Sequence, residues 1–171
     1  MGRDKASLDF EGEPLARRVA RILGVVAPRV IVASGDGSRL GWLGLEQVAD
    51  VEPDAGPLAG IVAGLEHAHT PLVAVAAVDM PFASADLFRF LAGLWAGEDA
   101  VVPLTDRGME PLHAVYAAGA APALRALLAS GERSTWRALE SVRARVVGEG
   151  DWRSADPDSA FAHNLNRPED L

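Results

Sequence analysis

The sequence predicts a three-layer α/β fold with a mixed, mostly parallel sheet, and two observations lead to this prediction. Segments rich in β-branched residues alternate with segments whose apolar residues recur every three or four positions, as strands alternate with helices. The segment PLVAVAAVDMPF (71–82) is apolar on both faces until Asp79, which is typical of a strand covered by helices on both sides. With 171 residues, 49% of them hydrophobic, and no visible linker or repeat, the chain 1–171 is predicted to be one domain.

The first half of the chain is predicted to contain two helices and three strands. A helix is expected from about Glu13 to Val26, because its apolar residues fall on one helical face. Strands are expected in 29–34 and in 43–50, the second of them ending at Asp50. Pro57 suits the first turn of the next helix, where a missing N–H costs nothing.

The second half continues the alternation. Ser84 is placed to cap a helix through its hydroxyl group. The remaining expected elements are strands at 99–104 and 113–118, a helix around Leu124–Leu128, a helix from about Ser134, and closing segments at 144–148 and 160–166. Doubly wound nucleotide-binding folds normally begin with a buried strand that leads into a glycine-rich loop. No strand precedes MGRDKA (1–6), so the first strand of the expected fold is predicted to be missing.

Composition excludes several classes of protein. A net charge of −8 argues against nucleic-acid binding, which requires a basic face, and the absence of cysteine excludes thiolate chemistry. No apolar run approaches the length of a membrane span and no signal-peptide pattern occurs, so a cytoplasmic protein without membrane contact is expected. The sequence also lacks the GxSxG motif of many hydrolases.

Lys5 is the single lysine among 16 basic residues, the other 15 being arginines. Where arginine supplies nearly every positive charge, a retained lysine indicates a need for a compact ammonium group rather than a planar guanidinium. Lys5 is therefore a candidate for a functional role.

Asp79 is the strongest single candidate, because it is expected to end the most apolar strand, at the edge where open α/β sheets bind ligands. A carboxylate there suits Mg²⁺ that also binds phosphates, although a turn or helix-capping aspartate is the ordinary alternative. Asp50 ends another expected strand and could bind a nucleobase, although a solvated loop carboxylate is the more common outcome. The segment DAGPLAG (54–60) could offer free N–H groups at a helix start, or could be an ordinary loop.

Asn164 and Asn166 lie two positions apart near the C-terminus and share a face if the chain is extended there. Two amides on one side could hold a polar ligand, although asparagines near turns more often bond to the backbone. The histidines show no spacing typical of metal ligands.

Taken together and in order, MGRDKA, GPLAG, VDMPF, EPLHAVY and NLNRPEDL resemble the molybdenum cofactor guanylyltransferases over nearly the whole chain. The resemblance implies a Rossmann-like nucleotidyltransferase domain. It also implies an enzyme that transfers GMP from GTP to molybdopterin with Mg²⁺ and releases pyrophosphate. GTP and molybdopterin would be its partners, with molybdenum-enzyme maturation proteins as further ones.

The resemblance also implies roles for individual residues, carried over by matching position. Lys5 and Asp79 would be catalytic, with Asp79 holding Mg²⁺, and both would bind the nucleotide together with Gly2 and Asp50. The acceptor side would be formed by Gly56, Pro57, Gly60, Asn164 and Asn166.

One departure from the family pattern is specific. Members begin with a strand and an L-A-G-G-x-S-x-R loop before the motif that opens this chain, and loss of that central strand would leave two strand edges unpaired. The first hypothesis is an active enzyme whose natural start lies further upstream. The second is a non-catalytic relative that binds nucleotide or a partner. Within the same fold, a nucleotidyltransferase that uses another base or acceptor, such as a cytidylyltransferase or a sugar-phosphate enzyme, is a further alternative.

Overall fold

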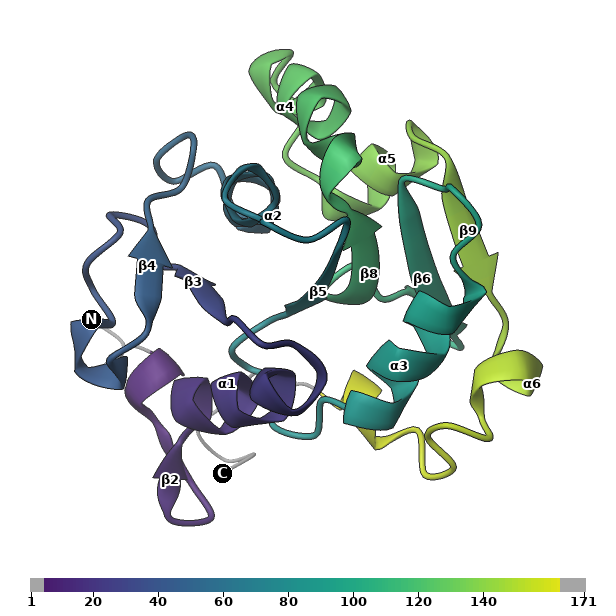
Figure 1. Ribbon diagram of the computed structural model, residues 1–171, viewed down its shortest axis with the longest axis horizontal. Helices are drawn as coiled ribbons and strands as arrows, with labels where there is room; N and C mark the ends of the chain where they lie inside the picture. Colours follow the sequence, from purple (N-terminus) through teal and green to yellow (C-terminus); the bar gives the residue numbers. More distant parts are fainter. Residues whose placement is uncertain (1–4, 164–171) are drawn as a thin grey trace.

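The computed structural model describes residues 5–163, which form a mixed α/β structure with helices on both faces of the sheet strands (Figure 1). The strands are β1 (Asp9–Phe10), β2 (Glu13–Pro14), β3 (Ile31–Ala33), β4 (Glu46–Val48), β5 (Leu72–Ala76), β6 (Ala100–Thr105), β7 (Gly108–Met109), β8 (His113–Ala117) and β9 (Ala144–Val147). The α-helices are α1 (Leu15–Val26), α2 (Pro57–Glu66), α3 (Ala85–Leu94), α4 (Ala121–Ala129), α5 (Thr135–Glu140) and α6 (Glu149–Trp152). Gly2, Asn164 and Asn166 lie outside the described residues, and a single domain over 1–171 stays a prediction.

The main sheet has the strand order β5-β8-β6-β7, with β9 also paired to β6. Strand β8 runs antiparallel to both β5 and β6, so β5 and β6 point in the same direction, and β9 is parallel to β6. The predicted mixed sheet is therefore confirmed, although within residues 5–163 three of the four pairings in the main sheet are antiparallel and only β6–β9 is parallel. The carboxyl ends of β5 and β6 lie at one edge of it, where α/β folds bind ligands.

The sheet is interrupted between β3 and β5. Strands β3 and β4 form a separate parallel pair, and within residues 5–163 β3 bonds only to β4 and β5 only to β8. These are two unpaired edges of the kind that the sequence predicts. The expectation that β5 is buried on both faces is wrong in degree, because all five of its residues are half-buried. A strand with a neighbour on one side only keeps part of each side chain accessible.

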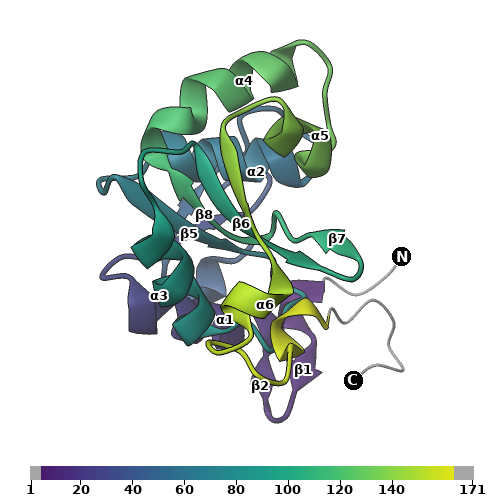
Figure 2. The same cartoon turned by 90° about the vertical axis from the view of Figure 1, so that its right-hand side faces the viewer.

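The helices divide into two groups that cover opposite faces, as Figure 2 shows. One core packs α2, α4 and α5 against the sheet, with Leu58, Leu124 and Leu139 fully buried. The other packs α1, α3 and α6, and its largest buried side chains are aromatic. In the part of the chain that the structure describes, no helix is both long and apolar enough to cross a membrane.

Two boundaries differ from the sequence-based expectation in ways that affect the site. The first helix begins at Leu15 rather than Glu13, because Glu13 and Pro14 pair with Asp9 and Phe10 in a short antiparallel hairpin. Strand β5 ends at Ala76, so Asp79 does not end the strand but lies three residues beyond it, in a turn. The two-residue strand β7 and the four-residue helix α6 were not predicted, because elements this short show no periodicity.

His113, the first residue of β8, is fully buried within the second core. Its imidazole ring stacks on Phe88 of α3, with ring centres 4.0 Å apart and planes 9° from parallel. Phe161 lies against the same ring at 4.7 Å. Burial disfavours the charged ring and lowers the pKa of His113 to about 3, so the ring is neutral at physiological pH.

We expect this histidine to make stability depend on pH. Between its ordinary pKa of 6.5 and the lowered value, the unfolded state binds one more proton, so stability is lost as pH falls through this window. The loss is about 1.4 kcal/mol per pH unit, or about 2 kcal/mol between pH 7 and pH 5. Urea unfolding of the wild type and of His113→Phe at both pH values measures it, because the variant lacks this contribution. The prediction would be contradicted if the difference in the free energy of unfolding between the wild type and His113→Phe were the same at both pH values.

Candidate active site

Lys5 and Asp79, the two predicted catalytic residues, form an ion pair although they lie 74 positions apart. Lys5 Nζ donates to Asp79 Oδ2 at 3.0 Å. Lys5 comes from a 3-10 turn (Lys5–Ser7), and Asp79 comes from the turn that follows β5. The lysine side chain is 45% exposed and the aspartate 21%, so both charged groups can be reached by a ligand.

Two side chains from other elements hold the segment that follows Asp79. Arg18 of α1 donates from Nε to the Pro81 carbonyl at 2.8 Å. Further along, the Ser84 amide N–H donates to Nε2 of buried His113 at 2.9 Å. The Ser84 hydroxyl accepts from the Leu87 amide and caps α3, as predicted. The backbone that presents the carboxylate is thereby fixed to α1, α3 and β8.

The β1–β2 hairpin connects the segment that carries Lys5 to the same turn. The Phe10 and Phe82 rings pack edge to face, with ring centres 5.4 Å apart. The Arg18 guanidinium lies 5.1 Å from the centre of the Phe10 ring and pairs with Glu11 at 2.9 Å. Arg18 therefore contacts both the hairpin and the Asp79 turn, and the two halves of the ion pair share one support.

Asp50 lies two residues past β4 beside Gly60 of α2, so the structure brings together two residues that the sequence named separately. The Asp50 amide donates to the Gly35 carbonyl at 2.9 Å, whereas its side-chain Oδ1 is buried without a hydrogen-bond partner among the described residues. Burial raises the pKa of this carboxyl. A Cβ on Gly60 would lie 3.4 Å from Oδ1 and 3.2 Å from the Ala33 side chain. An unpartnered buried acceptor of this kind suits a ligand that donates N–H groups.

Gly56 and Pro57 direct the chain into α2. Gly56 has φ 78° and ψ −169°, a conformation that essentially only glycine adopts, and it immediately precedes the helix. Pro57 is the first residue of α2, as predicted. The helix start therefore depends on this Gly-Pro pair, and Gly60 lies one turn further along.

The donor set around Asp79 is small. Residues 5–163 contain no cluster of three or more His, Cys, Asp or Glu side chains that could hold a metal ion by themselves. Mg²⁺ commonly binds through one or two carboxylates together with substrate phosphates and water. Asp79 fits a metal that arrives with a phosphate ligand, rather than one held permanently by the protein.

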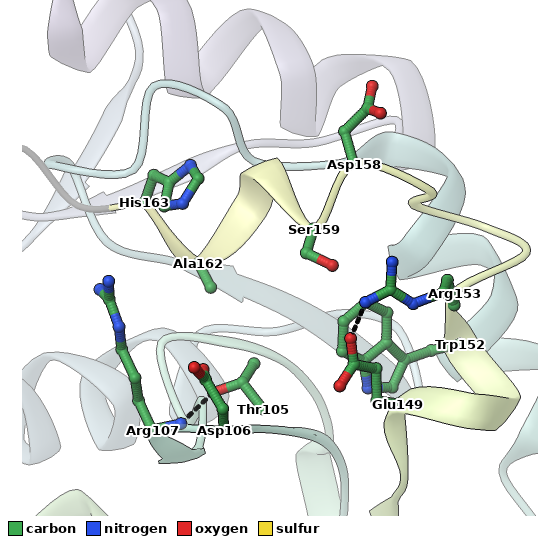
Figure 3. Close-up of a pocket in the computed structure, with 10 residues that line it drawn as sticks. All are labelled: Thr105, Asp106, Arg107, Glu149, Trp152, Arg153, Asp158, Ser159, Ala162 and His163. Carbon is green, nitrogen blue, oxygen red and sulfur yellow. Dashed lines mark hydrogen bonds and ion pairs between the residues drawn. The ribbon is translucent and has the colours of Figure 1, made fainter.

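A separate cavity of about 360 Å³ lies beyond the carboxyl end of β6 (Figure 3). Its lining residues are Thr105, Asp106, Arg107, Glu149, Trp152, Arg153, Asp158, Ser159, Ala162 and His163. It includes none of the predicted site residues, and Arg153 is paired with Glu149. Three carboxylates against two guanidinium groups give the lining no positive excess, so the cavity does not favour a phosphate group.

The sequence did not identify Arg18 or His113 as parts of the site. Arg18 is one of 15 arginines and matches no motif, and His113 has no spacing to another histidine that is typical of metal ligands. Both act through backbone groups distant in the chain, which no local pattern reveals. Two signals were available: His113 begins an otherwise apolar strand, and it lies in the EPLHAVY segment (110–116) that carries part of the family resemblance.

The sequence matches the family described as MobA-like NTP transferase domain over residues 1–146. It is 36% identical over 172 residues to a protein of Pelotomaculum thermopropionicum named probable molybdenum cofactor guanylyltransferase, covering 100% of this chain and 83% of that protein. The crystal structure of molybdopterin-guanine dinucleotide biosynthesis protein A from Archaeoglobus fulgidus superposes with a TM-score of 0.83 at 30% identity. That superposition covers 99% of this chain and 87% of the other.

A second solved structure is similar in fold alone. The 2-C-methyl-D-erythritol 4-phosphate cytidylyltransferase from Thermus thermophilus superposes with a TM-score of 0.68 at 19% identity, over 97% of this chain and 89% of that one. Identity this low indicates a shared nucleotidyltransferase architecture without indicating a shared substrate.

We expect the Lys5–Asp79 pair to contribute little to folding stability. Ion pairs between accessible side chains are worth about 0–1 kcal/mol, because water screens them. Lys5→Gln and Asp79→Asn should each change the free energy of unfolding by less than about 1 kcal/mol, as measured by urea titration. A loss of several kcal/mol in either variant would mean that the pair is needed to hold the fold.

Proposed function

The chain belongs to the MobA-like NTP transferase family, and from this premise we propose that it transfers GMP from GTP to molybdopterin and releases pyrophosphate. The observation that carries the proposal for this chain is the accessible Lys5–Asp79 pair just past the end of β5. GTP and molybdopterin are the proposed substrates, and the cytoplasm is the proposed location. Molybdenum-enzyme maturation proteins are the proposed further partners.

The proposed reaction is a substitution at the α-phosphorus of GTP. An oxygen of the acceptor's terminal phosphate forms a bond to that phosphorus, and the bond to the bridging oxygen of the β-phosphate breaks. Pyrophosphate leaves with the electron pair of the broken bond. Catalysis of this kind depends on positioning the phosphates and neutralising the charge that spreads over their oxygens.

Lys5 supplies positive charge where the protein as a whole is acidic. Its ammonium group has three donors on a flexible stem, and it can turn from Asp79 toward a phosphate oxygen. Asp79 is the residue that would hold Mg²⁺, which neutralises part of the triphosphate charge when it is bound with the nucleotide. Arg18 and the hairpin keep the backbone of this turn in place while the ion pair exchanges partners.

Asp50 is proposed to recognise the base. Guanine presents two adjacent donors on its pairing edge, N1–H and the 2-amino group, which match the two oxygens of one carboxylate. Cytosine presents a single amino donor beside acceptors, so a carboxylate favours guanine over cytosine. Gly60 leaves room for this contact, because a side chain there would crowd Asp50 Oδ1.

The acceptor side of the site rests on residues that the structure describes only in part. Gly56, Pro57 and Gly60 are proposed to shape the space between the two substrates. Asn164 and Asn166 are proposed to bind molybdopterin, and Gly2 the nucleotide, on the basis of the resemblance alone, since all three lie outside residues 5–163.

Asp79→Asn is expected to lower the rate of GMP transfer by about 10²–10³, the cost of removing one electrostatic stabiliser from an active site. The measurement is pyrophosphate release with GTP, Mg²⁺ and molybdopterin. Asp86→Asn is the matched control, because Asp86 is an exposed carboxylate in the first turn of α3 that pairs with Arg89. Equal rates in Asp79→Asn and Asp86→Asn would refute a catalytic role for Asp79.

Asp50→Asn is expected to reduce the preference for GTP over inosine triphosphate, which lacks the 2-amino group. Hydrogen bonds to a charged partner are worth about 1.5–3 kcal/mol, so kcat/KM for GTP should fall about 10-fold or more. The value for inosine triphosphate should change less. Asp54→Asn, an exposed loop carboxylate, serves as the control. If wild-type protein used CTP as well as GTP, the proposed recognition of guanine would be wrong.

A further inference from the structure

We propose that His113 is a positioning residue for the transfer reaction, fixing the turn that presents Asp79 through its hydrogen bond to the Ser84 amide. This inference rests on the proposed function and deepens it. Within residues 5–163, His113 makes no recorded contact with Lys5 or Asp79, and its ring lies in the core below the site. Its effect on the reaction would pass through the backbone between Asp79 and Ser84.

The hydrogen bond defines the state of the ring. Because Nε2 accepts the Ser84 N–H at 2.9 Å, it carries no proton, and the proton of the neutral ring sits on Nδ1. Nδ1 is buried and has no hydrogen-bond partner in the described part of the chain. A ring that only filled space would pack as well without nitrogen atoms and would leave no buried N–H unpaired. The acceptor at Nε2 is therefore the feature that distinguishes histidine from phenylalanine here.

The ring is locked so that Nε2 points in one direction. The Phe88 ring stacks on one face of the His113 ring, with ring centres 4.0 Å apart. The centre of the Phe161 ring lies 4.7 Å from that of His113. Phe161 in turn meets Trp152 edge-on at 5.1 Å, and the Trp152 indole donates to the Leu104 carbonyl. This aromatic row joins α3, β8, α6 and the turn at 160–162 into one rigid block.

The fixed acceptor determines where the Asp79 turn ends. The Ser84 hydroxyl is already used to cap α3, so the Ser84 amide depends on His113 for its partner. Together with the Arg18 bond to the Pro81 carbonyl, the His113 bond defines the path of 79–84 at two points. Loss of either should let Asp79 shift relative to Lys5, and a displacement of about 1 Å in a reacting site can cost about 10²-fold in rate.

The test compares three substitutions on one strand. His113→Phe keeps an aromatic ring and removes the acceptor, and His113→Gln restores an acceptor near the position of Nε2. Tyr116→Phe is the matched control, because Tyr116 is an equally buried residue of β8 whose hydroxyl donates to the Pro111 carbonyl rather than to the 79–84 segment. For each protein the measurements are kcat, the KM values for GTP and molybdopterin, the half-saturating Mg²⁺ concentration and the unfolding temperature.

His113→Phe is expected to lower kcat by about 10- to 100-fold and to raise the Mg²⁺ requirement, with the KM for molybdopterin unchanged. His113→Gln should recover most of the loss. Tyr116→Phe should lower the unfolding temperature without changing the kinetics. The proposal is overturned if His113→Phe works as well as the wild type, or if Tyr116→Phe loses activity in proportion to its loss of stability.

A second readout does not depend on catalysis. In amide NMR spectra, the signals of 79–84 should shift in His113→Phe, return toward the wild type in His113→Gln and stay in place in Tyr116→Phe. If the wild type transfers no GMP but the signals of 79–84 still shift in His113→Phe, the proposed function is refuted. The role of His113 in positioning the turn is then still supported. Unshifted signals would refute the positioning role whatever the activity.

Discussion

The turn between β5 and α3 is the constraint on which the candidate site depends. Asp79 lies outside regular structure, in a segment that is held by backbone bonds from Met80 to Ala77 and from Ala83 to Met80, and by side chains from other elements. Arg18 bonds to the Pro81 carbonyl and His113 to the Ser84 amide, one on each side of the Phe82 backbone. Packing of Phe82 against the β1–β2 hairpin then brings the N-terminal segment and Lys5 to the same place. An irregular segment thereby becomes a fixed support for a charged group.

Electrostatics at the site differ from those of the surface around it. The protein carries a net charge of −8, and most of its arginines are occupied with carboxylates or carbonyl groups in recorded ion pairs and hydrogen bonds. Within residues 5–163, Lys5 forms an ion pair with Asp79, and in the proposed reaction Mg²⁺ bound at Asp79 would free the ammonium group for a phosphate. The ion pair thus keeps both charges in position before a ligand arrives, at little cost to the fold.

Sequence patterns predicted the parts of the fold whose periodicity or capping chemistry is local. Pro57 at the start of α2 and Ser84 at the cap of α3 were predicted correctly, because proline geometry and hydroxyl capping act within one turn. Lys5 and Asp79 were named separately from motifs matched in order, and the structure brings their side chains together in an ion pair, while their catalytic roles stay a prediction. Arg18 and His113 could not be predicted, because each acts on a backbone group 29 or more positions away and leaves no periodic trace. The extent of β5 was overestimated, since apolar composition does not mark where hydrogen-bonded pairing stops.

The break between β3 and β5 has a consequence for cooperativity. No backbone ladder joins the β3–β4 pair to the main sheet in residues 5–163, so the two parts are connected through helix packing. Parts connected in this way tend to unfold as separate cooperative units, or foldons, each with its own free energy of opening. Asp50 belongs to the first part and Asp79 to the second. A nucleotide that contacts both would act as a cross-link between two foldons, and part of its binding energy would be spent on making them open and close as one unit.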